Sequence, residues 1–117
     1  MGNEKDNVLT GNAAANTLLA GAGNDTVEGG AGTDILWGQA GADVFVFKHG
    51  TQTDIVADFA IGQDKLDLTG IGFANATAVK AAMTQTGADI GLDLRGGEIA
   101  ILFGVNSASL TAGDFIL

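Results

Sequence analysis

Three six-residue segments follow one another at intervals of nine residues: AGAGND (residues 20–25), GGAGTD (29–34) and GQAGAD (38–43). In each copy a large apolar residue stands two positions after the aspartate, and these residues are Val27, Leu36 and Phe45. Glycine tolerates the positive φ angles of tight turns, and a lone apolar residue between two others suits a very short strand. The period therefore predicts a repeating unit of one turn and one strand.

Two such units complete one coil, so each strand is expected to stack on the strand two units later. Stacked strands lie about 4.8 Å apart, and the carboxylates of alternate units come equally close. At that distance two carboxylates repel by roughly 1–3 kcal/mol. Calcium removes the conflict, because it takes about six to eight oxygen ligands and the turns offer both carboxylate and carbonyl oxygens. The repeats predict a parallel β-roll that needs its metal for stability.

The pattern extends toward the N-terminus in weaker form. Asn16 and Leu18 take the aspartate and apolar places in a ten-residue copy that covers residues 10–19. Before it, Asp6 and Val8 repeat the same two-residue offset, although most of the glycine turn is missing. We therefore assign residues 6–47 to the roll.

Alternate units share one edge of the roll, so their acidic residues are expected to pair. The best calcium site is predicted between Asp25 and Asp43, a second between Asn16 and Asp34, and a weaker third between Asp6 and Asp25. The turn positions expected to contribute backbone oxygens are Gly21, Gly23, Gly30, Gly32, Gln39 and Gly41. The alternative is that these glycines and acids mark ordinary β-turns. Three copies in phase argue against that alternative.

Two features weaken or extend the predicted sites. Gln39 replaces the second glycine of its turn, and Asn16 offers an amide oxygen in place of a carboxylate. Further along the chain, Asp54 and Asp58 are placed to close the last turn with one more ligand. For Asp58 the alternative is a surface acid on an edge strand.

The second half of the chain has a different pattern. Alternating apolar residues predict strands at 53–59, 64–68, 89–94 and 98–103, the last two forming a hairpin around Arg95. Residues 76–86 predict a short amphipathic helix that ends at Gly87. A second helical turn is expected near 109–112. A roll this short needs a cap, and the outward pair Ile35 and Trp37 predicts that the segment after Phe47 covers Trp37.

Composition limits the possible functions. The chain has 117 residues and no cysteine, and its length predicts one domain (1–117). Its net charge of −9 argues against binding to nucleic acid and to anionic membrane surfaces. No stretch is long and apolar enough to predict a membrane span. The single histidine, His49, is expected in a solvent-facing loop and excludes a multi-histidine zinc site. No catalytic constellation is visible, so the chain is not predicted to be an enzyme.

At this point the chain resembles a known family. The segments NAAANTL (12–18), ADVFVF (42–47), DIVADF (54–59) and GQDKLDL (62–68) accompany the repeats in one order. This series resembles the C-terminal domain of serralysin-type metalloproteases and related RTX calcium-binding proteins, over residues 6–117. The resemblance implies a mainly β fold, in which a short parallel β-roll is followed by an antiparallel β-sandwich-like cap with one short helix (48–117). It also implies about two to four calcium ions.

The resemblance implies a function as well. Related proteins are exported through a type I, ATP-driven channel that reads an uncleaved C-terminal signal, and DFIL (114–117) fits the end of that signal. The expected protein is a secreted monomeric module of a larger parent, which folds on calcium outside the cell and has the export machinery as its partner. One alternative is a glycan- or surface-binding module of a polysaccharide-modifying enzyme or adhesin. Another is a passive stabilising cap for a catalytic domain.

Overall fold

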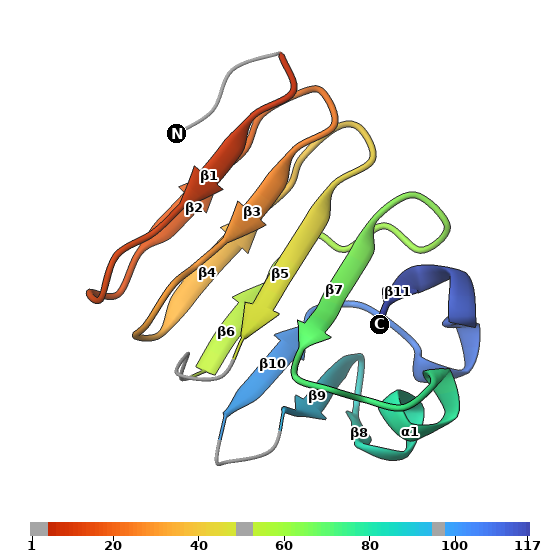
Figure 1. Cartoon of the computed structure of the whole chain (residues 1–117). Coiled ribbons are helices and arrows are strands. Elements are labelled where there is room, and N and C mark those ends of the chain that lie inside the picture. Colours follow the sequence, from red (N-terminus) through yellow and green to blue (C-terminus); the bar gives the residue numbers. More distant parts are fainter. Residues whose placement is uncertain (1–4, 49–52, 95–97) are drawn as a thin grey trace.

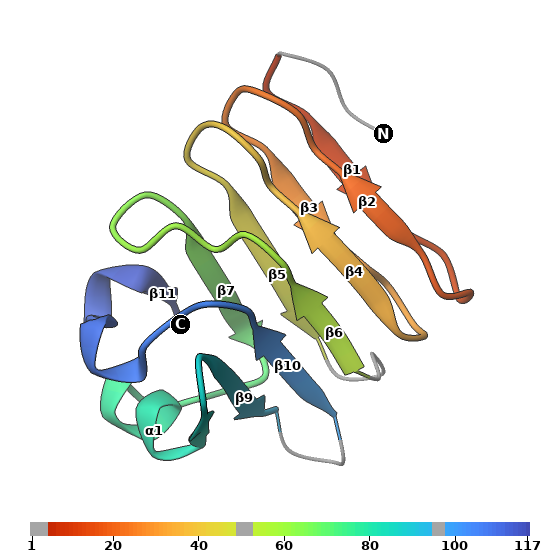
Figure 2. The same ribbon diagram turned by 180° about the vertical axis from the view of Figure 1, so that it is seen from behind.

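The computed structural model describes residues 5–48, 53–94 and 98–117. Figure 1 shows a roll in which the chain passes back and forth between two sheets. The five-stranded sheet has the order β1-β3-β5-β7-β11 and the six-stranded sheet the order β2-β4-β6-β10-β9-β8. Figure 2 shows the six-stranded sheet from the other side.

The strands are β1 (Val8–Thr10), β2 (Thr17–Leu19), β3 (Thr26–Glu28), β4 (Asp34–Trp37), β5 (Val44–Lys48), β6 (Thr53–Val56), β7 (Lys65–Gly70), β8 (Met83–Thr86), β9 (Asp89–Asp93), β10 (Ile99–Leu102) and β11 (Phe115–Ile116). One α-helix, α1 (Ala76–Ala81), and two 3₁₀ turns (Ser107–Ser109 and Ala112–Asp114) complete the described elements.

The nonapeptide period fixes the stacking of the early strands. Val27 pairs with Phe45 in the parallel pair β3–β5, and Leu18 pairs with Leu36 in β2–β4. Each partner stands eighteen residues, or two repeats, after the other. The predicted mainly β class and the parallel roll are confirmed.

The N-terminal register differs from our prediction by one residue. Leu9, not Val8, pairs with Val27 and packs against the core. Val8 points outward and is 78% exposed. Because successive side chains of a strand face opposite sides, a slip of one position exchanges the inner and outer sets. The predicted placement of Val8 inside the roll is wrong, since the missing glycines upstream left the register undetermined.

The second half of the chain lengthens the two sheets instead of forming a separate layer. β6 pairs in parallel with β4, and β7 pairs in parallel with β5, so a further coil follows the nonapeptides. β10 then pairs in parallel with β6, and β11 with β7. Among the described strands, antiparallel pairing is confined to β8–β9–β10. The cap is therefore a continuation of the roll that turns antiparallel at one edge.

One hydrophobic core runs between the sheets through both halves of the chain. Its largest fully buried side chains come from repeats and cap alike: Phe45, Phe47, Leu36, Leu66, Leu68, Ile90, Leu92, Leu94, Leu102 and Leu110. Phe45 and Phe59 meet with ring centroids 6.2 Å apart. The roll and its cap therefore share one hydrophobic core.

The helix predicted over residues 76–86 is shorter than expected. α1 begins after Asn75, whose side chain accepts the N–H of Ala78 at 2.9 Å, and ends at Ala81. Residues from Met83 onward form β8 on the edge of β9. The Gln85 amide holds this strand by donating to the carbonyls of Gly87, Asp89 and Val105. Tertiary pairing overrides the helical propensity here. The 89–94 and 98–103 strands form the predicted antiparallel pair, whereas Arg95 and His49 lie outside the described residues.

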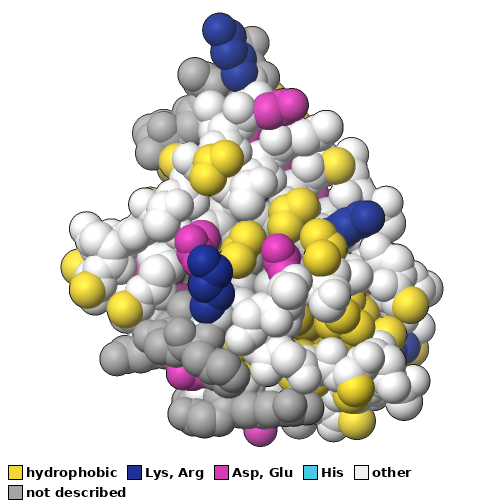
Figure 3. Space-filling view, in the orientation of Figure 1, with side chains coloured by type: hydrophobic (Ala, Val, Ile, Leu, Met, Phe, Trp, Pro, Cys, Tyr) yellow, Lys and Arg dark blue, Asp and Glu magenta, His cyan; other side chains and the backbone are white. Residues whose placement is uncertain are grey.

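The outer faces of the two sheets differ. Figure 3 shows apolar and charged side chains interspersed over the five-stranded sheet. On this sheet Lys48 and Glu28 form an ion pair of 3.0 Å. On the six-stranded sheet, Ile35 and Trp37 point outward as predicted. Trp37 remains 38% exposed, however, so the prediction that the later segment covers it is wrong. That segment adds strands beside β4 instead of a layer above it.

Candidate metal centre

Two columns of side chains follow the turns at the two edges of the roll. The Asp25 edge contains Asp25, Asp43 and Asp64, and the Asp34 edge contains Asn16, Asp34 and Asp54. Parallel stacking of the coils brings these residues into line, because each stands two residues before a core position of its strand. The expected pairings of Asp25 with Asp43 and of Asn16 with Asp34 are those of adjacent coils.

Each aspartate uses one oxygen to hold the preceding coil. Asp43 Oδ1 accepts the backbone N–H of Asp25 at 2.9 Å, and Asp25 Oδ1 accepts that of Asn7 at 2.7 Å. On the other edge, Asp34 Oδ1 accepts the N–H of Asn16 at 2.7 Å. Asp54 Oδ1 accepts the N–H of Asp34 at 3.2 Å. These bonds position the carboxylates and bury them between the turns.

The second oxygen of the same side chains has no protein partner. Oδ2 is buried and forms no hydrogen bond in Asp25, Asp34, Asp43 and Asp54. The four residues are at most 1% exposed. An isolated buried carboxylate oxygen is strongly unfavourable unless a cation or donor meets it. Four such carboxylate oxygens, arranged in two columns, are therefore suited to bind cations that prefer oxygen ligands.

The turn backbone has a repeated conformation. All six turn positions predicted to bind metal have positive φ: Gly21, Gly23, Gly30, Gly32, Gln39 and Gly41. Gln39, at φ 66°, is the one non-glycine among the described residues with this conformation. No residue of the described 11–16 turn has positive φ, so the turn before Asn16 differs from the others.

Backbone carbonyls crowd the space between stacked turns. A Cβ on Gly41 would collide with the carbonyl oxygen of Gly23 in the coil before it. On the other edge, a Cβ on Gly32 would lie 2.9 Å from the carbonyl oxygen of Ala13 and 3.0 Å from that of Ala14. The glycines therefore allow carbonyl oxygens of one turn to approach the backbone of the turn stacked on it.

Burial and mutual repulsion change the acidity of these groups. Burial, offset in part by the hydrogen bond from the Asp25 N–H and reinforced by the charges of Asp64, Asp25 and Asp58, raises the pKa of Asp43 to about 7. Burial, followed by the charge of Asp34, raises the pKa of Asp54 to about 7. The metal-free fold is thus strained by its own negative charge.

The donor set fits calcium and not a transition metal. Within the described residues, no three His, Cys, Asp or Glu side chains converge on one point. The available donors are carboxylate and carbonyl oxygens, which are the hard ligands that calcium prefers. Most ligands would come from the backbone, with about two side chains for each site.

One predicted ligand, Asp6, takes another position. Asp6 stands in the place of Asn24: Asp6 Oδ1 accepts the Asn24 N–H at 2.8 Å, as the Asn24 amide oxygen accepts the Ala42 N–H at 2.8 Å. Asn7, not Asp6, aligns with Asp25. The expected alignment of Asp6 with Asp25 is therefore wrong by one residue, for the same reason as that of Val8.

Asp58 closes the last nonapeptide turn. Its two oxygens accept the backbone N–H groups of Gly38 at 2.9 Å and Gln39 at 2.6 Å. The side chain of Asn16 is likewise engaged, because its Oδ1 accepts the N–H of Asn12 at 2.9 Å. Both residues hold turns in shape, and their role as metal ligands stays a prediction.

Sequence reasoning missed Asp64 and gave Asp54 too little weight. Asp64 Oδ1 accepts the Asp43 N–H at 2.9 Å, and Oδ2 accepts that of Ala60 at 2.8 Å. The signal was present, since Asp64 precedes Leu66 by the same offset as Asp43 precedes Phe45. The longer spacing of the last coil hid it: Asp64 follows Asp43 by twenty-one residues.

The fold and the two edges together define a calcium-binding parallel β-roll. The family model for the RTX calcium-binding nonapeptide repeat matches residues 1–27 and 10–45. The chain thus belongs to the RTX repeat proteins, with its repeats in residues 1–45. A comparison with curated protein sequences gives no match.

Solved structures of repeat modules share the whole fold. The AlgE6R2 subunit of the Azotobacter vinelandii mannuronan C5-epimerase is 27% identical with a TM-score of 0.69, over 99% of this chain and 90% of the subunit. The AlgE6R3 subunit of that enzyme is 30% identical with a TM-score of 0.61, over 99% of this chain and 80% of the subunit.

The extracellular lipase LipA of Serratia marcescens has the same fold in part. It is 24% identical with a TM-score of 0.68 over 97% of this chain, and the chain spans 20% of the lipase. Among the described residues, none of the helices has the length and apolar character needed to cross a bilayer. The narrower likeness to the serralysin-type C-terminal domain stays a prediction.

Proposed function

We propose that this chain is a module of a larger exported protein, folds when calcium binds it outside the cell, and carries the export signal at its C-terminus. The observation that supports this most directly is the set of four buried, unpartnered carboxylate oxygens. A chain that buries these charges has little reason to fold until cations are present. The proposal gives the module no catalytic role and leaves any chemistry to its parent.

The energetics match a switch between compartments. External calcium is near the 10⁻⁴ to 10⁻³ M dissociation constants of extracellular modules, whereas cytosolic calcium is far below them. At tenfold excess over its dissociation constant, one ion adds about 1.4 kcal/mol, and three add about 4 kcal/mol. That is comparable with the whole stability of a small domain. Asp25, Asp34, Asp43 and Asp54 would hold the ions together with the turn carbonyls.

Circular dichroism with and without calcium tests the folding part. We expect a disordered spectrum in EDTA and a β spectrum in millimolar calcium, with magnesium as the control for ionic strength. A chain that is equally folded in EDTA would contradict the proposal.

The C-terminal DFIL segment is a defined element of the folded module. Asp114 is buried, and its carboxylate accepts the N–H groups of Gly62 at 3.1 Å and Thr111 at 2.7 Å. Phe115 is buried in β11 beside β7. The export machinery would therefore read this segment before the chain folds, which fits a channel for unfolded chains.

Export of a passenger fused to this chain, through a type I channel, tests the second part. Deletion of residues 116–117 shortens the signal but removes only half-exposed side chains, so export should fall at least tenfold. The control is Thr111→Ala, which removes the 3.4 Å hydrogen bond that the Thr111 hydroxyl donates to Asp114 and leaves the signal intact. An equal loss of export in both variants, or no loss of export after the deletion, would contradict a signal role for this segment.

A further inference from the structure

The outer face of the six-stranded sheet carries an uncovered row of apolar side chains. Ile35, Trp37, Ile99 and Phe103 are each between 36% and 43% exposed on β4, on β10 or directly after it. Five of the seven aromatic residues are buried in the core, and the other two, Trp37 and Phe103, both lie on this face. An exposed patch that concentrates both free aromatics on one side indicates a contact surface.

The sheet register aligns the two aromatic rings. Leu36 pairs with Val56, and Val56 pairs with Leu102. One residue further along each strand, Trp37, Ala57 and Phe103 form a row across the sheet. Because neighbouring strands lie about 4.8 Å apart, the two aromatic positions are separated by about 9.6 Å. The small side chain of Ala57 lies between the two aromatic positions, and these three residues are called the platform below.

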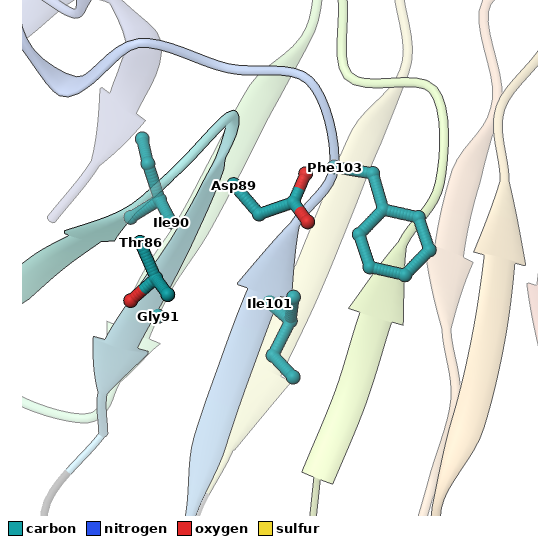
Figure 4. Close-up of a pocket in the computed structure, with 6 residues that line it drawn as sticks. All are labelled: Thr86, Asp89, Ile90, Gly91, Ile101 and Phe103. Atoms are coloured by element: carbon teal, nitrogen blue, oxygen red, sulfur yellow. The ribbon is translucent and has the colours of Figure 1, made fainter.

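A pocket continues this row beyond Phe103. It has a volume of about 330 Å³ and is lined by Thr86, Asp89, Ile90, Gly91, Ile101 and Phe103 (Figure 4). Gly91 leaves the hollow open, since a Cβ there would meet nothing within 4 Å. Figure 4 shows the Asp89 carboxylate beside Phe103 at the end of β10.

The polar groups of the pocket are hydrogen-bond partners for hydroxyl groups. Asp89 Oδ1 is held by the N–H of Gly104 at 2.9 Å. Among the described residues Oδ2 has no hydrogen bond, so it can accept one from a ligand. Thr86 adds a hydroxyl that donates or accepts. A mostly apolar hollow with a few convergent polar groups is typical of small-ligand sites.

We propose that this face binds a neutral, β-1,4-linked hexose polysaccharide in extended form. The apolar faces of alternate sugar rings would stack on Trp37 and Phe103, since about 9.6 Å is close to the length of an extended disaccharide unit. A sugar hydroxyl would donate to Asp89 in the pocket. The inference goes beyond calcium-driven folding and export and requires only that the module be folded.

Charge separates this ligand from two competitors. An anionic polysaccharide would meet the Asp89 carboxylate on a sheet face where, among the described residues, no lysine or arginine points outward. A second copy of the chain that used the same face would bring a second Asp89 carboxylate to it. A neutral glycan avoids both repulsions.

Titration of the calcium-loaded chain with mannohexaose, a neutral β-1,4-linked oligosaccharide, tests the proposal. Trp37 is the single tryptophan, so its emission reports directly on the platform. We expect a blue shift that saturates. By calorimetry, Trp37→Ala and Phe103→Ala should each weaken binding about tenfold. The control Val8→Ala, at a fully exposed position on the other sheet, should bind like the parent.

Mannuronan of the same length and linkage separates charge from shape. It differs from mannohexaose by its carboxylates, and we expect it to bind at least tenfold more weakly at low salt. Equal binding of the two, an equal loss in Val8→Ala, or no binding of mannohexaose would overturn the proposal. Burial of Trp37 by self-association, seen in sedimentation, would identify the face as a protein interface instead. Dichroism on the same samples shows that the module is folded, which keeps these outcomes separate from the calcium test.

Discussion

At Asp43, one oxygen of a side chain holds a neighbouring coil while the other is left without a partner. The bond from the Asp25 N–H makes the carboxylate part of the stack, and burial raises its pKa to about 7. The same residue therefore favours the fold through one oxygen and opposes it through the charge on the other. The metal decides which effect dominates.

Asp43→Asn separates the two effects. The amide keeps an oxygen for the Asp25 N–H but removes the buried charge, so the metal-free fold should gain on the order of 1 kcal/mol. Calcium affinity should fall about tenfold, because one charged ligand is lost. Urea denaturation in EDTA, with sucrose added to favour the compact state, and calcium titration by dichroism measure the two changes. The control is Asp67→Asn, outside the turns, and a variant that binds calcium like the parent would exclude Asp43 as a ligand.

The raised pKa values predict opposite pH dependence with and without calcium. The pKa of Asp43 and of Asp54 is about 7 in the folded chain, compared with the ordinary value of 3.8 that applies to the unfolded chain. Between pH 3.8 and about 7 the folded chain therefore binds more protons than the unfolded chain. Metal-free stability is therefore greatest below about pH 4 and is lost as the pH rises to about 7. Calcium must displace these protons, so calcium-loaded stability should rise over the same range.

Urea midpoints at pH 5 and pH 8 check this, with sucrose added to both metal-free samples to favour the compact state. A metal-free chain that is more stable at pH 8 than at pH 5 would show that the charges of Asp43 and Asp54 do not destabilise the metal-free fold.

At the scale of the elements, a stacked turn limits which residues fit at the glycine positions of its neighbour. Gly41 has φ 103°, and a side chain there would meet the carbonyl oxygen of Gly23. Gly72 has a similar φ of 87°, but a Cβ would meet nothing within 4 Å. A comparison of Gly41 with Gly72 therefore separates the cost of a positive φ from the cost of a collision with the stacked turn.

Gly41→Ala should cost more than Gly72→Ala. The strain of positive φ is common to both and amounts to about 1 kcal/mol. Collision with the stacked turn should add about 2 kcal/mol or more in Gly41→Ala and weaken calcium binding as well. Urea denaturation in calcium compares the two variants. Equal losses would mean that the stacked carbonyls do not restrict this position.

Over the whole molecule, the roll and its continuation share one core. Val56 and Leu102 extend the inner row of Leu36, and Leu66 extends that of Phe45. Without the later strands, β4 and β5 would each lose a neighbour and expose this row.

A chain that ends at residue 48 should therefore remain unfolded even in millimolar calcium. It keeps the nonapeptides but loses the strands that pair with β4 and β5. Dichroism of residues 1–48 and of the full chain at equal calcium measures this. A β spectrum from the short chain would show that the repeats fold alone.

The sequence by itself determined the roll, because a strict nine-residue period allows only one stacking of Val27 on Phe45 and of Leu18 on Leu36. It also located the aspartates and glycines of the turns for the same reason. Where the period failed, at Val8 and again after Phe47, local patterns could not determine pairing. β8 became a strand through its hairpin with β9, whereas strand neighbours far apart in the chain decided that Asp64 joins the Asp25 edge and that Trp37 stays uncovered. These depend on contacts between distant segments, which no local spacing records.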